Sequence, residues 1–243
     1  MTTIINKNEK VSIVLPSYNE KNNISEAIER ISKSLGEDLL EIIVVDDNSP
    51  DGTWKIVENI HKTNSKVKLI RRMNKRGLAS ALADGIEKTK GNVIVWMDCD
   101  LGLPPEDIPR LVEKLNGYDV SIGSRYVKGG KDLRSKPIVM LSVLFNLYCR
   151  LILGSKVKDY TSGFVAVKKD VLKEVQWSKN GFGEYFIEFA YKSMKKKFKI
   201  TEVGYVYRNR KSGVSKLSGN TLSLIKNGFK YGIKVLELRF NNL

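Results

Sequence analysis

The run from Glu41 to Asp47, EIIVVDD, constrains the fold more than any other stretch of the sequence. Its four consecutive β-branched residues favour an extended strand that has no polar face. Strands of this kind occur in parallel sheets, whose two faces are both covered by helices. The run therefore predicts an α/β fold.

Strands and amphipathic helices alternate around this run. Val11–Leu15 predicts a strand that stops at Pro16, and a helix follows from about Asn22 to Leu35. The pattern then repeats through a helix at Thr53–Thr63, a strand at Val67–Arg71, a helix at Leu78–Lys88 and a strand at Val93–Met97. This βαβαβαβ order predicts a doubly wound, mostly parallel sheet with helices on both faces.

The rest of the chain continues the alternation. We expect a helix at Asp107–Leu115, strands at Asp119–Ile122, Val165–Lys168 and Ile200–Tyr207, and a helix at Glu184–Lys197. We expect a catalytic domain over residues 1–219 and a C-terminal basic amphipathic helix over residues 220–243.

Polar residues gather where the expected strands end. PSYNE follows the first strand, DDNS the second and Arg71-Arg72 the third. Ligands of doubly wound sheets bind beyond these carboxyl ends. No Gly-x-Gly-x-x-Gly or Gly-Lys-Ser/Thr follows a strand, so neither a dinucleotide fingerprint nor a P-loop is present.

Asp98-Cys99-Asp100 follows the apolar strand Val93–Trp96. Residues i and i+2 of an extended segment face the same way, and Mg²⁺ or Mn²⁺ takes such oxygen ligands together with substrate phosphates. A lone Asp-x-Asp is also common in solvated turns, so its surroundings must decide between a metal site and a turn.

Charge and composition narrow the function classes. The 42 Lys+Arg against 27 Asp+Glu give a net charge of +15, which favours phosphate-bearing partners. The single histidine, His61, gives little support to Ser-His or Cys-His catalysis. Cys99 and Cys149 lack metal-ligand spacing and indicate a reducing compartment. No signal peptide is evident, and no run of 18 apolar residues predicts a spanning helix.

Several motifs carry a family resemblance. In order they are LPSYNE, DDNSPDGT, NKRGLASAL, MDCDLGLPPEDIP, GSRY, DYTSGF and GVSKL. Over roughly Val11 to Leu222 the chain resembles the family-2 glycosyltransferases of GT-A fold, and within them it is most similar to the dolichyl-phosphate mannose synthases.

The resemblance implies a donor site. It assigns the nucleotide sugar to Pro16, Tyr18, Glu20, Val45, Asp47, Asp98, Cys99, Arg210 and Lys216. By the same resemblance, Asp98 together with Asp100 would hold Mg²⁺ or Mn²⁺, with Cys99 beside the metal through its backbone. Arg210 and Lys216 would close over the diphosphate. The chain departs from some relatives at Gly102, where they have a polar residue, and at Asn209, where the usual residue is Asp.

Arg125 follows a strand and suits bidentate contact with an oxyanion. The resemblance implies that it contacts the acceptor or the donor phosphate, and we expect it at the acceptor phosphate. The resemblance adds Ser142 and a cation four residues before it. Ile138 stands at that position here, so either Arg134 or Lys136 must supply the charge, and of the two we assign it to Arg134. The catalytic set is therefore expected to be Asp98, Asp100, Arg125 and Arg210, and Asp159 is expected to orient an arginine.

Two segments have amphipathic patterns. In KPIVMLSVLFNLYCRLIL, residues 136–153, the polar residues fall at Ser142, Asn146 and Arg150, one face of a helix. This segment is either a buried core helix or an interfacial helix with its polar stripe toward the active site. Thr221–Asn241 is basic and amphipathic, and it either binds an anionic membrane surface or docks on the catalytic domain.

The activity implied by the resemblance is inverting transfer of mannose from GDP-mannose to dolichyl or another polyprenyl phosphate. Peripheral association with the cytoplasmic side of a membrane and a small membrane-protein partner go with it. UDP-glucose as donor and a hydroxyl group as acceptor remain alternatives. A nucleic-acid-binding module has less support because aromatic-rich RNA motifs are absent.

Overall fold

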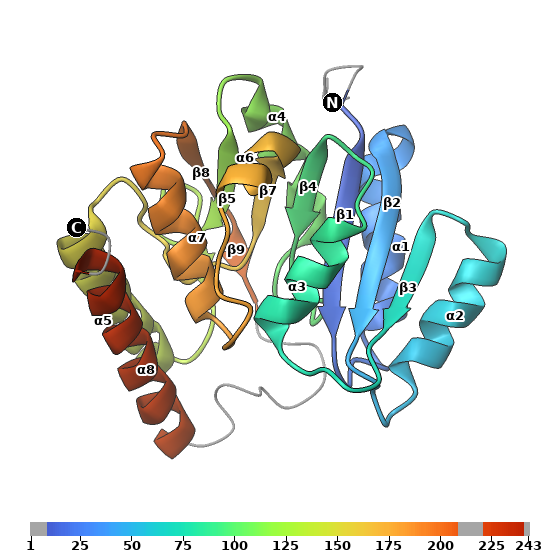
Figure 1. Cartoon of the computed structure of the whole chain (residues 1–243), viewed down its shortest axis with the longest axis horizontal. Coiled ribbons are helices and arrows are strands. Elements are labelled where there is room, and N and C mark those ends of the chain that lie inside the picture. Colours follow the sequence, from blue (N-terminus) through green and yellow to red (C-terminus); the bar gives the residue numbers. More distant parts are fainter. Residues whose placement is uncertain (1–8, 209–220, 241–243) are drawn as a thin grey trace.

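The computed structural model describes residues 9–208 and 221–240, and in the last helix it describes side chains from residue 228 onward. A seven-stranded sheet in the order β3-β2-β1-β4-β7-β5-β8 forms the centre (Figure 1). Its strands are β1 (Val11–Ser17), β2 (Leu39–Asp46), β3 (Val67–Arg71), β4 (Val93–Trp96), β5 (Val120–Ser124), β7 (Val165–Lys168) and β8 (Ile200–Gly204). All pairings in this sheet are parallel except those of β7. The predicted α/β fold with a mostly parallel sheet is confirmed.

Helices cover both faces of the sheet (Figure 1). They are α1 (Ile24–Leu35), α2 (Thr53–Thr63), α3 (Leu78–Glu87), α4 (Ile108–Glu113), α5 (Lys136–Leu153), α6 (Lys169–Glu174), α7 (Glu184–Lys195) and α8 (Thr221–Phe240), with 3₁₀ turns η1 (Gly36–Asp38), η2 (Pro105–Asp107) and η3 (Lys114–Asn116). Helices α1, α2 and α4 pack into the core on one face. Helices α3, α5, α6, α7 and α8 pack into the core on the other face.

The two cores are separated by the alternation of side chains along the strands. In β2, Ile42 and Val44 enter one core, while Ile43 and Val45 enter the other. Because side chains of a strand point alternately to opposite faces, the run of four β-branched residues serves both cores at once. The feature that predicted the fold is therefore also the feature that joins its layers.

Of the strands that the structure describes in this sheet, β7 is the one that runs antiparallel to the others, and its direction decides which segments reach the carboxyl edge of the sheet. It runs antiparallel to its neighbours β4 and β5. Its amino end therefore lies beside the carboxyl ends of the parallel strands, and the segment 159–164 that precedes it reaches the same edge. The sequence pattern contains no signal for this reversal.

A small second sheet forms where we expected one strand over Ile200–Tyr207. The chain forms β8 and then β9 (Val206–Tyr207), which pairs in parallel with β6 (Lys131–Asp132). A Cβ on Gly204 would overlap backbone atoms of the 128–130 loop, so the strand passes that loop only at a glycine and then changes partner. The short helix α6 was also missing from the predicted elements.

Helices α5 and α8 lie side by side at one edge of the molecule (Figure 1). The Tyr148 hydroxyl donates to the Gly232 carbonyl at 3.1 Å, and the rings of Phe145 and Tyr231 lie 6.1 Å apart. Val235 and Leu238 of α8 are buried. Helix α8 therefore docks on the rest of the protein, one of the two alternatives expected from the sequence, although its Phe229, Leu236 and Phe240 are exposed.

Helix α5 is the one helix of the described residues that is long and apolar enough to cross a membrane, by length and composition alone. Its mean hydropathy is 1.6 over 18 residues, and only 17% of these residues are buried. From the sequence we expected no spanning helix, because Ser142, Asn146 and Arg150 interrupt the apolar run. These three polar residues share one face of the helix, and the mean hydropathy stays high despite them. The division into a domain of residues 1–219 and a helix of 220–243 stays a prediction.

Candidate active site

The carboxyl edge of the sheet carries backbone that is unusual for non-glycine residues. Asn19, Asn48 and Leu101 follow β1, β2 and β4, and all three have positive φ, between 54° and 61°. Such conformations are held only where the surroundings fix them, and they cluster at binding sites. The loops expected to bind ligand are therefore the loops with constrained backbone.

The Asp-x-Asp segment lies in this edge, just after β4. Asp98 is half-buried and Asp100 is buried. The Gly102 N–H donates to Oδ1 of Asp100 at 2.9 Å, and the Cys99 thiol donates to the Pro16 carbonyl at 3.0 Å. Cys99 is a free, buried thiol, so it ties this loop to the end of β1.

The residues expected at the nucleoside come from neighbouring strands. Pro16 of β1 is paired in register with Val45 of β2, which is fully buried. The Arg76 guanidinium lies over the Tyr18 ring, 5.0 Å from its centre. Glu20 is nearly buried and accepts a hydrogen bond from the Asn23 amide at 2.8 Å. These side chains line one edge, as expected; their contact with a nucleotide stays a prediction.

Asp47 forms a buried ion pair that the sequence did not reveal. Its Oδ1 lies 2.5 Å from Nη2 of Arg72, and its Oδ2 accepts the Gly77 N–H at 2.8 Å. Arg72 also contacts Asp84 at 3.1 Å. Asp47 therefore anchors both ends of the 72–77 loop, which carries Arg76 to Tyr18.

Arg125 makes the bidentate contact that its position suggested, and the oxyanion is a carboxylate of the protein. Its guanidinium donates to both oxygens of Asp159, at 2.9 and 2.7 Å, and to the Thr161 hydroxyl at 2.7 Å. Burial disfavours the charged form, but Asp159 outweighs it and keeps the pKa of Arg125 well above its ordinary value. The expectation that Asp159 orients an arginine is confirmed, and contact of Arg125 with a substrate phosphate stays a prediction.

Arg134 and Ser142 lie around the same cluster. The Asp132 carboxylate accepts hydrogen bonds from Nε of Arg134 at 2.9 Å and from its Nη2 at 2.6 Å, and it lies 3.5 Å from Arg125. The Ser142 hydroxyl accepts from the Tyr126 hydroxyl at 2.7 Å. Arg134 is the more exposed of the two guanidiniums, with 24% of its side chain accessible against 4% for Arg125. A phosphate arriving at this cluster would therefore meet Arg134 first.

The polar stripe of α5 faces the protein. The Asn146 amide donates to the Thr161 hydroxyl at 2.9 Å, and its carbonyl accepts the Tyr160 N–H at 2.7 Å. The opposite side of the helix exposes a set of apolar residues, Met140, Leu141, Val143, Leu144, Leu147 and Leu151. This arrangement fits an interfacial helix and differs from a buried core helix.

The loop that carries Asp98, Asp100 and Gly102, called the metal loop below after its expected role, has an aromatic neighbour from β9. A Cβ on Gly102 would lie 3.0 Å from Cζ of Tyr207, 3.1 Å from its hydroxyl and 3.1 Å from Oδ1 of Asp100. Tyr185 of α7 lies near the same loop: burial raises the pKa of its hydroxyl well above its ordinary value, and the Asp98 carboxylate adds to that rise. Neither tyrosine could be identified from the sequence, because each lies more than eighty residues away along the chain.

The residues expected to close over the diphosphate, Arg210 and Lys216, lie outside the described residues, as does Asn209. The structure does show where that segment begins. The Arg208 N–H donates to the Gly102 carbonyl at 3.1 Å. The residue just before that segment is therefore hydrogen-bonded to the loop that carries Asp98 and Asp100.

The donor set at this edge fits a divalent metal that is shared with a ligand. Among the described residues, no group of three or more His, Cys, Asp and Glu side chains gathers to hold a metal. Asp98 and Asp100 offer two hard carboxylates, and Mg²⁺ or Mn²⁺ commonly takes one or two carboxylates together with phosphate oxygens and water. The pair suits a metal that arrives with a phosphorylated substrate better than a closed structural site.

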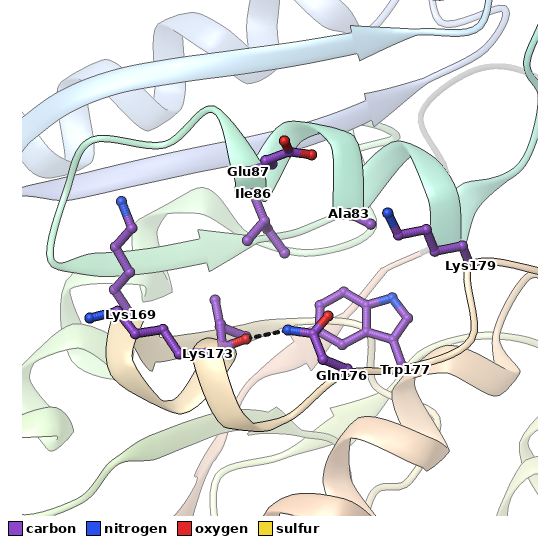
Figure 2. Close-up of a pocket in the computed structure, with 9 residues that line it drawn as sticks. Ala83, Ile86, Glu87, Lys169, Lys173, Gln176, Trp177 and Lys179 are labelled. Atoms are coloured by element: carbon purple, nitrogen blue, oxygen red, sulfur yellow. Dashed lines mark hydrogen bonds between the residues drawn. The ribbon is translucent and has the colours of Figure 1, made fainter.

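A cavity of about 330 Å³ lies elsewhere, between α3 and α6 (Figure 2). Its lining residues are Ala83, Ile86, Glu87, Lys169, Leu172, Lys173, Gln176, Trp177 and Lys179. Lys169 follows β7 and its N–H donates to the carbonyl of Asn92, just before β4 begins. One end of the cavity, at Lys169, therefore lies near the amino ends of the parallel strands, while Trp177 in its lining packs against Trp96 at the carboxyl end of β4.

The chain is similar to known proteins both in sequence and in fold. The family model for glycosyl transferase family 2 matches residues 12–176. A dolichol-phosphate mannosyltransferase of Pyrococcus furiosus is 40% identical over 222 residues, covering 88% of this chain and 60% of the relative. A polyprenol monophosphomannose synthase of Mycolicibacterium smegmatis is 32% identical over 223 residues, covering 88% of this chain and 83% of the relative.

The chain thus spans about 60% of the length of the Pyrococcus relative. Among solved structures, it resembles glucosyl-3-phosphoglycerate synthase from Mycobacterium tuberculosis in complex with Mn²⁺, UDP and glucosyl-3-phosphoglycerate. The TM-score is 0.71 at 22% identity, and the match covers 96% of this chain and 80% of that chain. This similarity concerns the fold.

Proposed function

Because the chain belongs to glycosyl transferase family 2, we propose that it transfers mannose from GDP-mannose to a polyprenyl phosphate such as dolichyl phosphate, with inversion. The names of its relatives support both the sugar and the class of acceptor. The donor base rests on the motif resemblance.

The observation that carries the proposal is the two-sided character of α5. One side is hydrogen-bonded to the Arg125 cluster through Ser142 and Asn146, and the other side exposes apolar residues such as Leu144 and Leu151. An acceptor with a phosphate and a hydrocarbon tail needs both surfaces next to each other. A sugar hydroxyl or a protein acceptor would not need the apolar one.

The chemistry follows from the charge of the acceptor. A polyprenyl phosphate is already an anion, so no general base is required to make the nucleophile. The remaining needs are positioning of the two substrates and stabilisation of the leaving diphosphate. Bound metal would act as a Lewis acid on the diphosphate, and Asp98 and Asp100 would hold it there.

The other side chains divide the remaining roles. Tyr18, Glu20 and Asp47 would position the nucleoside, and Arg210 and Lys216 would neutralise the diphosphate. Arg134, with Arg125 behind it, would orient the acceptor phosphate. The partly exposed guanidinium of Arg134, paired to Asp132, suits a residue that holds an anion in a fixed geometry.

The exposed apolar residues of α5 and α8 also support peripheral membrane association. Phe229, Ile233 and Phe240 of α8 add to the exposed leucines of α5, and the two helices are packed together. Contiguous exposed apolar surface of this kind marks interaction sites. We place this surface on the cytoplasmic side of a membrane, where a small membrane-protein partner could also bind, and we expect no nucleic-acid partner.

A transfer assay tests the proposal. Radiolabelled GDP-mannose and UDP-glucose are each offered with and without polyprenyl phosphate, in the presence of Mg²⁺ or Mn²⁺ and then of a chelator. We expect label in the lipid fraction only with GDP-mannose, polyprenyl phosphate and metal together. Label transferred from UDP-glucose, or transfer to a hydroxyl acceptor without the lipid, would replace the proposed donor or acceptor.

A further inference from the structure

Tyr207 lies between the two charged parts of the site. On one side its hydroxyl and the Asp100 carboxylate border the same methyl-sized space above Gly102. On the other side, Cζ of Arg134 lies 5.1 Å and Cζ of Arg125 lies 5.8 Å from the centre of its ring. A phenol in this place contacts the carboxylate loop and the cations of the proposed acceptor site at once.

The backbone fixes Tyr207 in this position. Tyr207 pairs in register with Asp132, which accepts hydrogen bonds from Arg134, and its carbonyl accepts the Leu133 N–H at 3.0 Å. The next residue, Arg208, donates its N–H to Gly102 at 3.1 Å. Hydrogen bonds on both sides thus hold the phenol against the metal loop.

Glycine at position 102 is what allows this approach. Any side chain there would begin 3.0 Å from the Tyr207 ring, closer than ordinary van der Waals contact. The absence of a side chain at Gly102 therefore leaves room for the Tyr207 ring. The polar group next to Asp100 is supplied by β9, which lies over a hundred residues later in the chain.

We propose that Tyr207 is a donor-site residue whose hydroxyl donates a hydrogen bond to a diphosphate oxygen of the metal–nucleotide complex held at Asp98 and Asp100. This deepens the proposed function and rests on it for the identity of the ligand. A neutral phenol can donate to phosphate without adding a further charge beside Asp100. The same ring, packed by Arg134, fixes the distance between donor and acceptor phosphates.

The test compares two tyrosines of the same strand region. Tyr207→Phe removes the hydroxyl that lies beside Gly102. Tyr205→Phe removes the hydroxyl of a buried ring whose centre lies 6.4 Å from the centre of the Tyr207 ring. Affinity for Mn²⁺·GDP is measured by calorimetry without acceptor, together with the melting temperature. We expect Tyr207→Phe to weaken binding roughly tenfold and Tyr205→Phe to change it by less than about twofold.

A second variant changes the other partner of this contact, Gly102. Gly102→Ala places a methyl group against the Tyr207 ring and Asp100, and it should also weaken Mn²⁺·GDP binding. Because both changes act on one contact, their effects should be less than additive in the double variant. Equal binding by Tyr207→Phe and the wild type, equal losses for the two tyrosines, or full additivity would overturn the inference.

The outcome is separable from that of the proposed function. Binding is measured without lipid, so a failure of transfer to polyprenyl phosphate leaves the Tyr207 comparison intact. If the wild type binds Mn²⁺·UDP in place of Mn²⁺·GDP, the donor assignment fails and the same variants are compared with UDP. If the wild type binds the metal–nucleotide complex normally and transfers mannose while Tyr207→Phe does both equally well, the function stands and the inference fails.

Discussion

At the scale of single residues, Asp98 is the cleaner probe of the metal, because it is half-buried whereas Asp100 is buried. We expect Asp98→Ala to lower kcat at least about a hundredfold, since under the proposed function it would remove a ligand of the metal that stabilises the leaving diphosphate. The measurement is mannosyl transfer at saturating Mn²⁺ and GDP-mannose.

Asp170→Ala is the matched control for Asp98→Ala, because its carboxylate is 86% exposed and pairs only with Lys173 on the surface among the described residues. A chelator should abolish the activity of the wild type and of this control, and added Mn²⁺ should restore both. Near-normal turnover by Asp98→Ala would exclude the metal role of that residue.

Replacing Asp47 should destabilise the fold, and this effect must be separated from any role of Asp47 in ligand binding. Asp47→Ala leaves the buried Arg72 with Asp84 as its remaining carboxylate partner, and breaking a buried pair in this way is strongly destabilising. We expect a loss of about 3 kcal/mol in the free energy of unfolding, measured in urea.

Asp84→Asn, which removes the partly exposed partner of Arg72, should cost about 1 kcal/mol or less. Similar losses for the two variants would mean that Arg72 is held equally by both carboxylates.

These residues show what the sequence could and could not predict. Asp98, Asp100, Asp47 and Arg125 were identified because they follow apolar strands, and the structure gathers them at one edge. Their protein partners, such as Arg72 for Asp47 and Tyr207 for Asp100, were not identified, because local patterning carries no information about which distant side chain will face a loop.

At the scale of elements, α5 yields a direct test of membrane association. Leu144 and Leu151 are 55% and 76% exposed. Replacing both with Glu should lower binding to phospholipid vesicles roughly tenfold or more, because each Leu loses its burial in the lipid. Sedimentation with vesicles of stated anionic content measures the effect.

Tyr118→Glu introduces the same charge at an exposed aromatic residue that precedes β5, and it should leave vesicle binding unchanged. The melting temperature of the double Leu variant should stay close to that of the wild type, since the replaced side chains already face solvent. Unchanged vesicle binding by the double variant would remove α5 from the membrane surface.

Docking of α8 depends on pH through Glu188. Burial tends to raise the pKa of Glu188, but hydrogen bonds from Lys192, Lys234 and the Ser178 N–H outweigh burial and hold the pKa below its usual value. A depressed carboxyl pKa gives stability that is present above the unfolded pKa, about 4.5, and is lost as the pH falls through the folded pKa.

We therefore expect hydrogen-exchange protection of α8 to fall as the pH drops below about 4.5, after correction for intrinsic exchange rates. Glu188→Gln should show reduced protection already at neutral pH, whereas Glu237→Gln, an exposed carboxyl on α8, should behave like the wild type. Wild-type protection of α8 in Glu188→Gln would show that apolar contacts alone hold the helix.

At the scale of the whole molecule, the alternation of strands and helices was predicted well, and the sheet order was not. The expected elements Thr53–Thr63, Val67–Arg71 and Val165–Lys168 match the structure residue for residue. The insertion of β7 between β4 and β5, in the opposite direction, could not be foreseen. Periodicity reports how a strand is buried but not the direction in which it runs.

That reversal has a functional result. Because β7 is antiparallel, Asp159 and Thr161 reach the edge where the parallel strands end, and there they hold Arg125. Segments from both halves of the chain thus build one site. A purely parallel sheet would have placed Asp159 at the opposite edge.

The two faces of α5 also determine how the substrates meet. Under the proposed function, the nucleotide sugar reaches the carboxyl edge from solution in three dimensions, whereas the acceptor moves within a membrane plane beside Leu144 and Leu151. The effective acceptor concentration is then a surface density. Adding inert phospholipid lowers the surface density of the acceptor and slows the reaction, even when the total amount of acceptor is constant. The concentration of the donor, by contrast, falls only when the volume of water is increased.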